Sequence, residues 1–183
     1  MKCNLFVLIV SYILLISNIN AQKFLGDGSV DFISKAPLET IRANSNKLRG
    51  VIDVNETNFA FSFPVNSFDG FNSPLQKEHF NEYYLETRKF PKATFEGKIL
   101  GLKECPETCS IEVFAKGKMN IHGVSKIMTI PLKLEIEKNK IRLKTNFEVL
   151  LADHDISIPR ILEAKISPLI AVTVTADFNT TDE

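Results

Sequence analysis

Apolar and polar residues alternate with a period of two along most of this chain of 183 residues, and no other feature restricts its fold as strongly. Ile141, Leu143 and Phe147 fall on one face of an extended strand, whereas Arg142 and Lys144 fall on the other. Since successive side chains of a strand point to opposite faces, this pattern predicts a strand with one buried face. Eight runs of this kind are predicted as strands: 29–34, 41–54, 58–64, 93–101, 111–121, 128–136, 141–151 and 170–178.

One predicted hairpin can be tested for its register. A two-residue turn at 138–139 pairs Glu135 with Arg142 on the outer face and Ile136 with Ile141 on the inner face. Opposite charges and apolar side chains thus both find matching partners across the two strands. The sequence therefore favours an antiparallel hairpin in this register.

Residues 73–84 interrupt the alternation and have the pattern of a short helix, with Ser73 as a suitable N-cap and Pro74 as its first residue. A second helical turn is predicted at 159–164. A sheet with one apolar face and this many long strands is best buried by closing it, which also removes its edges. We expect an all-β fold: an eight-stranded antiparallel β-barrel with one or two short helices near the opening.

The predicted inner face of the barrel includes small residues, most notably Gly97, Ala115 and Gly117. Small residues either allow tight packing against bulky neighbours or leave space for a ligand, and the sequence leaves both alternatives open. A cavity with phenylalanine and aliphatic walls would suit a long apolar molecule. The candidate cavity-lining residues are Phe59, Phe61, Phe63, Phe80, Tyr84, Phe95, Gly97, Ile99, Val113, Ala115, Gly117, Met119, Leu132, Leu134 and Phe147.

The N-terminus has the layout of a secretory signal peptide: a positively charged start, an apolar run from Leu5 to Ile16 and a polar segment ending at Ala21. The apolar run is too short to cross about 30 Å of hydrocarbon as a helix. We expect residues 1–21 to be cleaved and residues 22–183 to form one domain, with an uncleaved anchor as the alternative. No membrane span is expected after cleavage.

Removal of the signal peptide leaves two cysteines, Cys105 and Cys109, between two predicted strands. An oxidising compartment favours a disulfide between them at the tip of a hairpin. Their C-x-x-x-C spacing differs from the C-x-x-C of thiol oxidoreductases, so a redox or metal-binding pair is the weaker alternative.

Charge and motifs argue against other classes of function. The 22 basic and 22 acidic residues cancel, whereas nucleic-acid-binding proteins usually have a basic face. The three histidines show no metal-ligand spacing, and no hydrolase or phosphate-binding motif is present. A surface metal site formed by His154 with Asp153 or Asp155 remains as an alternative. We expect no catalysis, no metal and no cofactor other than a bound lipid.

Several segments together resemble the YceI-like lipid- and polyisoprenoid-binding family: GSVDF at 28–32, LQKEHFNE at 75–82, YLETRKFPKATF at 84–95 and GKMNIHGVSK at 117–126. The resemblance covers most of the chain that would remain after cleavage. It implies an elongated, lipocalin-like barrel of eight antiparallel strands that is exported by bacteria and binds an isoprenoid or a related lipid inside.

The combined expectation is an exported bacterial protein, periplasmic or secreted, that holds or shuttles a small apolar lipid, isoprenoid-like, in a barrel cavity. On this hypothesis, Gly117→Trp would abolish lipid uptake while the fold survives. The alternative is an exported structural or interaction module with a filled barrel, no ligand and an exposed apolar patch around residues 68–71. A metal-assisted enzyme is the third hypothesis.

Overall fold

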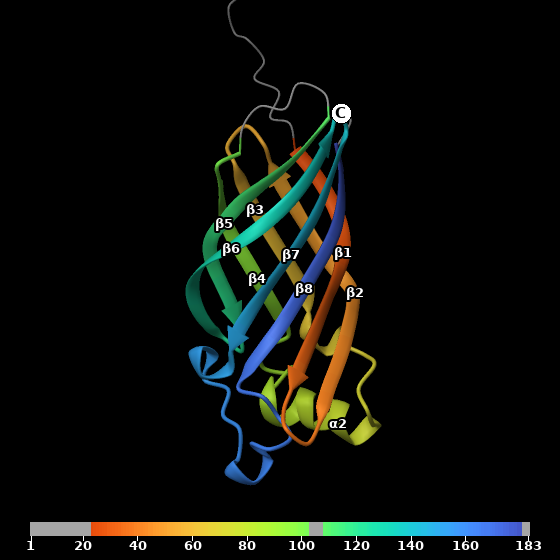
Figure 1. The fold of residues 1–183 in the computed structure, drawn as a ribbon, viewed down its shortest axis with the longest axis vertical. Helices are drawn as coiled ribbons and strands as arrows, with labels where there is room; N and C mark the ends of the chain where they lie inside the picture. Colours follow the sequence, from red (N-terminus) through yellow and green to blue (C-terminus); the bar gives the residue numbers. More distant parts are fainter. Residues whose placement is uncertain (1–22, 103–107, 181–183) are drawn as a thin grey trace, which may run out of the picture.

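A computed structural model describes residues 23–102 and 108–180, and within them eight antiparallel strands close into a barrel (Figure 1). Each strand pairs with the next along the chain, and the last pairs with the first. The expected all-β barrel is therefore confirmed. The strands are β1 (Lys23–Lys35), β2 (Thr40–Asp53), β3 (Asn58–Pro64), β4 (Lys92–Leu100), β5 (Cys109–Ile121), β6 (Val124–Glu137), β7 (Lys140–Leu150) and β8 (Leu169–Thr180).

The predicted strand bounds differ from the observed ones mainly at β1, which begins at Lys23 rather than at Ser29. Two glycines, Gly26 and Gly28, hide the alternation in this part of the sequence. A Cβ atom on Gly26 would collide with the backbone oxygen of Asp177 on β8, so the close approach of the two strands requires glycine there. The predicted signal peptide and its cleavage site lie outside the described residues.

The hairpin of β6 and β7 has the predicted register, with Glu135 opposite Arg142 and Ile136 opposite Ile141. The ladder ends at the like-charged pair Lys133 and Lys144. Beyond this pair the two strands diverge, and the separation is visible in Figure 1.

Pro131 provides a physical reason for the end of this ladder. Its carbonyl accepts a hydrogen bond from the Thr145 hydroxyl on β7, so its backbone polar groups face β7. A residue in an antiparallel ladder directs its N–H and C=O toward the same neighbour, and proline has no N–H to offer. The β6–β7 ladder therefore stops at Lys133 and Lys144. The first half of β6 and the second half of β7 are separated by a gap, here called the split.

A short 3₁₀ turn, η3 (Leu151–His154), lies beside this split. The buried His154 side chain attaches η3 to β6, because its Nδ1 lies 3.1 Å from the carbonyl oxygen of Val124. The His154 carbonyl in turn lies 3.1 Å from Nδ1 of His122, in the turn between β5 and β6. These bonds hold η3 over the gap.

The remaining helical segments also gather at this end of the barrel, here called the α2 end (Figure 1). They are η1 (Val65–Ser67), α2 (Pro74–His79), its π-helical continuation η2 (Phe80–Tyr84) and the 3₁₀ turn η4 (Arg160–Leu162). Ser73 caps α2 as predicted, since its hydroxyl accepts a hydrogen bond from the Gln76 N–H. The predicted helical turn at 159–164 corresponds to η4. No helix among the described residues is long and apolar enough to cross a membrane.

Candidate functional site

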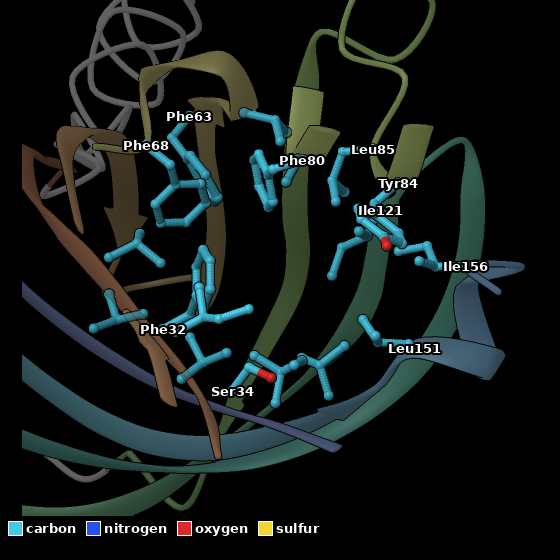
Figure 2. A pocket seen from close by; sticks show the side chains of 18 of the residues that line it. Phe32, Ser34, Phe63, Phe68, Phe80, Tyr84, Leu85, Ile121, Leu151 and Ile156 are labelled. Carbon is cyan, nitrogen blue, oxygen red and sulfur yellow. The ribbon is translucent and has the colours of Figure 1, made fainter. Parts of the chain in front are cut away.

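The barrel contains an elongated cavity of about 380 Å³. It runs from the α2 end along the inside of the barrel as far as Leu143 and Phe178, and most of its walls are aromatic or aliphatic. Figure 2 shows the side chains around the open space, with Phe32 and Phe68 on one side and Leu85 and Ile156 on the other. A site of roughly 300–1,000 Å³ is large enough to bury most of a small organic molecule.

A cluster of five phenylalanines attaches α2 and η2 to the barrel. The ring of Phe80 stacks on Phe32 with 5.7 Å between ring centroids, and it meets Phe68 edge-on at 5.8 Å. Phe71 and Phe63 complete the cluster through contacts with Phe80 and Phe68 respectively. Such aromatic pairs contribute about 0.5–1.5 kcal/mol each beyond their burial. The cavity wall at this end is therefore built from the contact between the helical segment and the barrel.

The polar groups within the barrel mostly bind other parts of the protein. The hydroxyl of buried Ser34 accepts a hydrogen bond from the Ser167 N–H, and buried Thr145 donates to Pro131. Burial raises the pKa of the Tyr84 phenol, so this group stays neutral through the physiological range. The interior consequently presents a largely apolar, uncharged surface.

The cavity reaches the surface between α2 and the segment around η4. Ser73, Leu75 and Lys165 line the cavity and are also solvent-exposed, which places the mouth among them. Glu39, in the turn between β1 and β2, also lines this region, and its Oε1 lies 3.0 Å from Nε2 of Gln76 on α2. Polar and charged groups thus collect at the mouth, whereas the deeper part is apolar.

The structure brings about half of the predicted lining residues into the cavity wall. Those that line it are Phe61, Phe63, Phe80, Tyr84, Phe95, Met119, Leu132 and Phe147. Those that lie outside the lining are Phe59, Gly97, Ile99, Val113, Ala115, Gly117 and Leu134. The second group faces inward as predicted but lies beyond the cavity, where side chains fill the barrel. Period-two alternation identifies the inner face, but it does not give the depth of a residue along the barrel axis.

The small residues belong to this filled part, which corrects the interpretation of Gly97 and Gly117 as space for a ligand. The two glycines face each other on β4 and β5. A Cβ on Gly117 would collide with the backbone oxygen of Glu96. Gly97 also pairs with Phe59, whose ring packs 4.8 Å from that of Phe95. Tight packing against bulky neighbours is therefore the correct alternative, and Gly117→Trp would disrupt the barrel rather than block a cavity.

Other lining residues were not selected from the sequence. Some lie on strand faces that the alternation identifies as inward, but the alternation does not show that they are at the level of the cavity. Others come from irregular segments without periodicity, where no sequence signal was available. The first kind includes Phe32, Thr145, Val149, Leu151, Val172 and Val174, and the second includes Ile156 and Ile166. Leu162 lies in the predicted helical turn at 159–164.

The alternative sites on polar residues find little support in the described residues. His154 is only 1% exposed and bonded to backbone, so it is not part of a surface metal site with its aspartate neighbours. His122 Nε2 lies 2.9 Å from the Glu86 carboxylate. Within residues 23–102 and 108–180, no group of three His, Cys, Asp or Glu is placed to hold a metal ion. Cys105 lies outside the described residues, so the disulfide with Cys109 stays a prediction.

Residues 68–71 do not form the expected exposed apolar patch. Phe68 is buried and Phe71 is half-buried, since both pack in the phenylalanine cluster. The alternative of a filled barrel is disfavoured by the cavity itself.

Comparisons with known proteins find one matching family model and several solved structures with a similar fold. The family model described as YceI-like domain matches residues 26–179. A polyisoprenoid binding domain from Saccharophagus degradans, implicated in plant cell wall breakdown, has a TM-score of 0.71 at 14% identity, covering 88% of this chain and 100% of that chain. BcnA from Burkholderia cenocepacia has a TM-score of 0.68 at 13% identity, with 82% and 95% covered.

A YceI protein from Campylobacter jejuni has a TM-score of 0.57 at 18% identity, covering 77% of this chain and 85% of that chain. No curated protein matches the sequence. At these low identities, the structural similarity shows a shared fold.

Proposed function

The chain belongs to the YceI-like domain family, and on that premise we propose that it binds an apolar lipid, isoprenoid-like, inside its barrel and holds or shuttles it outside the cytoplasm. The observation that carries this proposal is the elongated apolar cavity of about 380 Å³. Its walls provide few polar groups for a polar ligand, whereas burial of a hydrocarbon chain would stabilise the complex by about 0.8 kcal/mol per methylene. One of the similar structures is a polyisoprenoid binding domain, which supports the same class of ligand.

Export is the second part of the proposal. It is supported by the sequence of residues 1–21, which has the three regions of a signal peptide. Expression of the full chain in a bacterium, followed by fractionation and N-terminal sequencing, tests it. The expected result is a periplasmic or secreted protein that begins at Gln22; a cytoplasmic chain that begins at Met1 would contradict export.

Extraction of the natively purified protein with organic solvent, followed by mass spectrometry, tests lipid binding directly. We expect one lipid class, present at a defined ratio to the protein. Val174→Trp provides the matched loss of binding, because Val174 lines the cavity and a larger side chain there would occupy it. The neighbouring Thr175 is exposed on the outer face of the same strand, so Thr175→Trp is its control.

The expected outcome is at least about tenfold less bound lipid in Val174→Trp and an unchanged amount in Thr175→Trp. Circular dichroism and thermal unfolding of both variants show whether the barrel is intact. A wild-type protein without extractable lipid that also fails to bind added lipid would contradict the proposed function and favour the structural or interaction module.

A further inference from the structure

Three aliphatic side chains project into solvent around the mouth of the cavity. Leu38 is 73% exposed, Leu75 is 58% exposed and Ile161 is 88% exposed. We call these three residues the rim. They come from the turn between β1 and β2, from α2 and from η4 respectively, and Figure 1 shows all three segments at the α2 end. Exposed apolar side chains that gather at one place on a soluble domain mark a site of interaction.

Hydrogen bonds hold the rim segments together around the mouth. The backbone N–H of Leu38 donates to the Ala164 carbonyl at 2.8 Å, which joins the β1–β2 turn to the segment after η4. Glu39 joins the same turn to α2 through Gln76. Leu75 itself lines the cavity. Leu75 therefore links the rim to the apolar lining of the barrel, and Leu38 and Ile161 are next in sequence to the lining residues Glu39 and Leu162.

Charged groups near Ile161 complement a phospholipid surface. Arg160 and Lys165 are both exposed, and neither forms an ion pair within the described part of the chain. Glu163 lies between them in sequence and is also exposed. Two cations and one carboxylate match headgroups that carry a phosphate together with an ammonium group. Apolar side chains flanked by cations are typical of protein segments that lie in the membrane interface.

We propose that the rim docks reversibly on the surface of a phospholipid bilayer, so that a lipid passes between the bilayer and the cavity mouth without crossing water. This inference rests on the proposed function for its purpose, but docking itself can be measured without a ligand. Burial of only three side chains produces weak, reversible attachment, because stable anchoring needs more apolar area. Weak attachment is what a carrier that leaves the membrane with its cargo requires.

The test uses the double variant Leu38→Ser/Ile161→Ser, which removes two rim side chains outside the cavity lining. Leu25→Ser/Phe114→Ser is the matched control, since both residues are 53% exposed and lie on β1 and β5 away from the α2 end. Flotation with vesicles of phosphatidylethanolamine and phosphatidylglycerol measures docking. Transfer of a fluorescent polyprenol from the same vesicles measures delivery, and uptake of that polyprenol from detergent solution measures cavity binding.

We expect the rim variant to show at least about tenfold less flotation and slower transfer than the wild type, with unchanged uptake from detergent. The control should match the wild type in all three measurements. Equal flotation of the rim variant and the wild type would overturn the docking proposal. So would a wild-type dimer in analytical ultracentrifugation that the rim variant loses, because the rim would then bind a second copy. If the wild type floats with vesicles but takes up no polyprenol from detergent, the proposed function is overturned and the docking proposal stands.

Discussion

At the scale of single residues, the pair Gly97 and Gly117 shows why a small side chain on an inner face does not by itself indicate a ligand. Both positions satisfy the alternation that identifies inward residues. The backbones of β4 and β5 approach so closely there that a Cβ on either glycine would collide with the neighbouring strand. The sequence pattern shows which face of a strand a residue occupies. The distance between the two backbones depends instead on how strongly the strands coil around the barrel, and no local pattern encodes this coiling.

Gly117→Ala provides the corresponding prediction. The added methyl group meets the Glu96 backbone oxygen, so β4 and β5 must separate, and we expect a loss of about 1–3 kcal/mol in the free energy of unfolding. Denaturation in urea measures this loss. Lys116→Ala is the control, because Lys116 points outward from the same strand, and it should change stability by less than about 0.5 kcal/mol. A Gly117→Ala protein as stable as the wild type would contradict the packing explanation.

At the scale of secondary-structure elements, the strands, α2 and η4 follow from the sequence, whereas η3 does not. The hairpin of β6 and β7 could be predicted residue by residue, because charge and apolarity both depend on its register. The separation of the two strands beyond it is also encoded, since a proline within a strand run marks an edge and Pro131 lies within the predicted strand 128–136. η3 spans only Leu151–His154, too few residues to show a helical period.

His154→Ala tests the interpretation that η3 covers the split. The substitution removes a buried ring and leaves the Val124 carbonyl without its partner, so we expect a loss of about 2–4 kcal/mol in the free energy of unfolding. Thermal and urea denaturation measure it. Asp153→Ala is the control within the same turn, since Asp153 forms an exposed 3.7 Å ion pair with Lys126 and such pairs contribute at most about 1 kcal/mol. Equal losses in the two variants would show that His154 has no special role.

At the scale of the whole molecule, the inward-facing phenylalanines of the described residues divide into two groups with different roles. One group, with Phe59, fills the barrel beyond the cavity, where its ring packs 4.8 Å from that of Phe95 in the cavity wall. The other, with Phe32 and Phe80, fixes the helical segment and forms part of the cavity wall. The alternation and the helix pattern predicted both sets as inward, but only the closed barrel shows where filling stops. The position of the cavity is thus a property of packing in three dimensions.

The dimensions of the cavity lead to a prediction about ligand length. The elongated cavity of about 380 Å³ can bury only a limited length of alkyl chain. Primary alcohols from octanol to hexadecanol should therefore bind more tightly with each added methylene, by about fourfold in Kd. The gain should end once the cavity is full, because further carbons extend past the mouth toward solvent.

Phe147→Trp makes this measurement direct, since the natural sequence has no tryptophan and Phe147 lines the cavity. Bound alcohol should displace water from the indole and shift its emission to shorter wavelength. A second tryptophan at Val174 would add its own fluorescence, so Val174→Phe is used to shorten the cavity. The plateau in Kd should then move to shorter alcohols. A continued gain through hexadecanol in both proteins would mean that the chain lies along the outer surface. A plateau that Val174→Phe shifts would place the chain inside the barrel, with its polar end among the charged groups at the mouth.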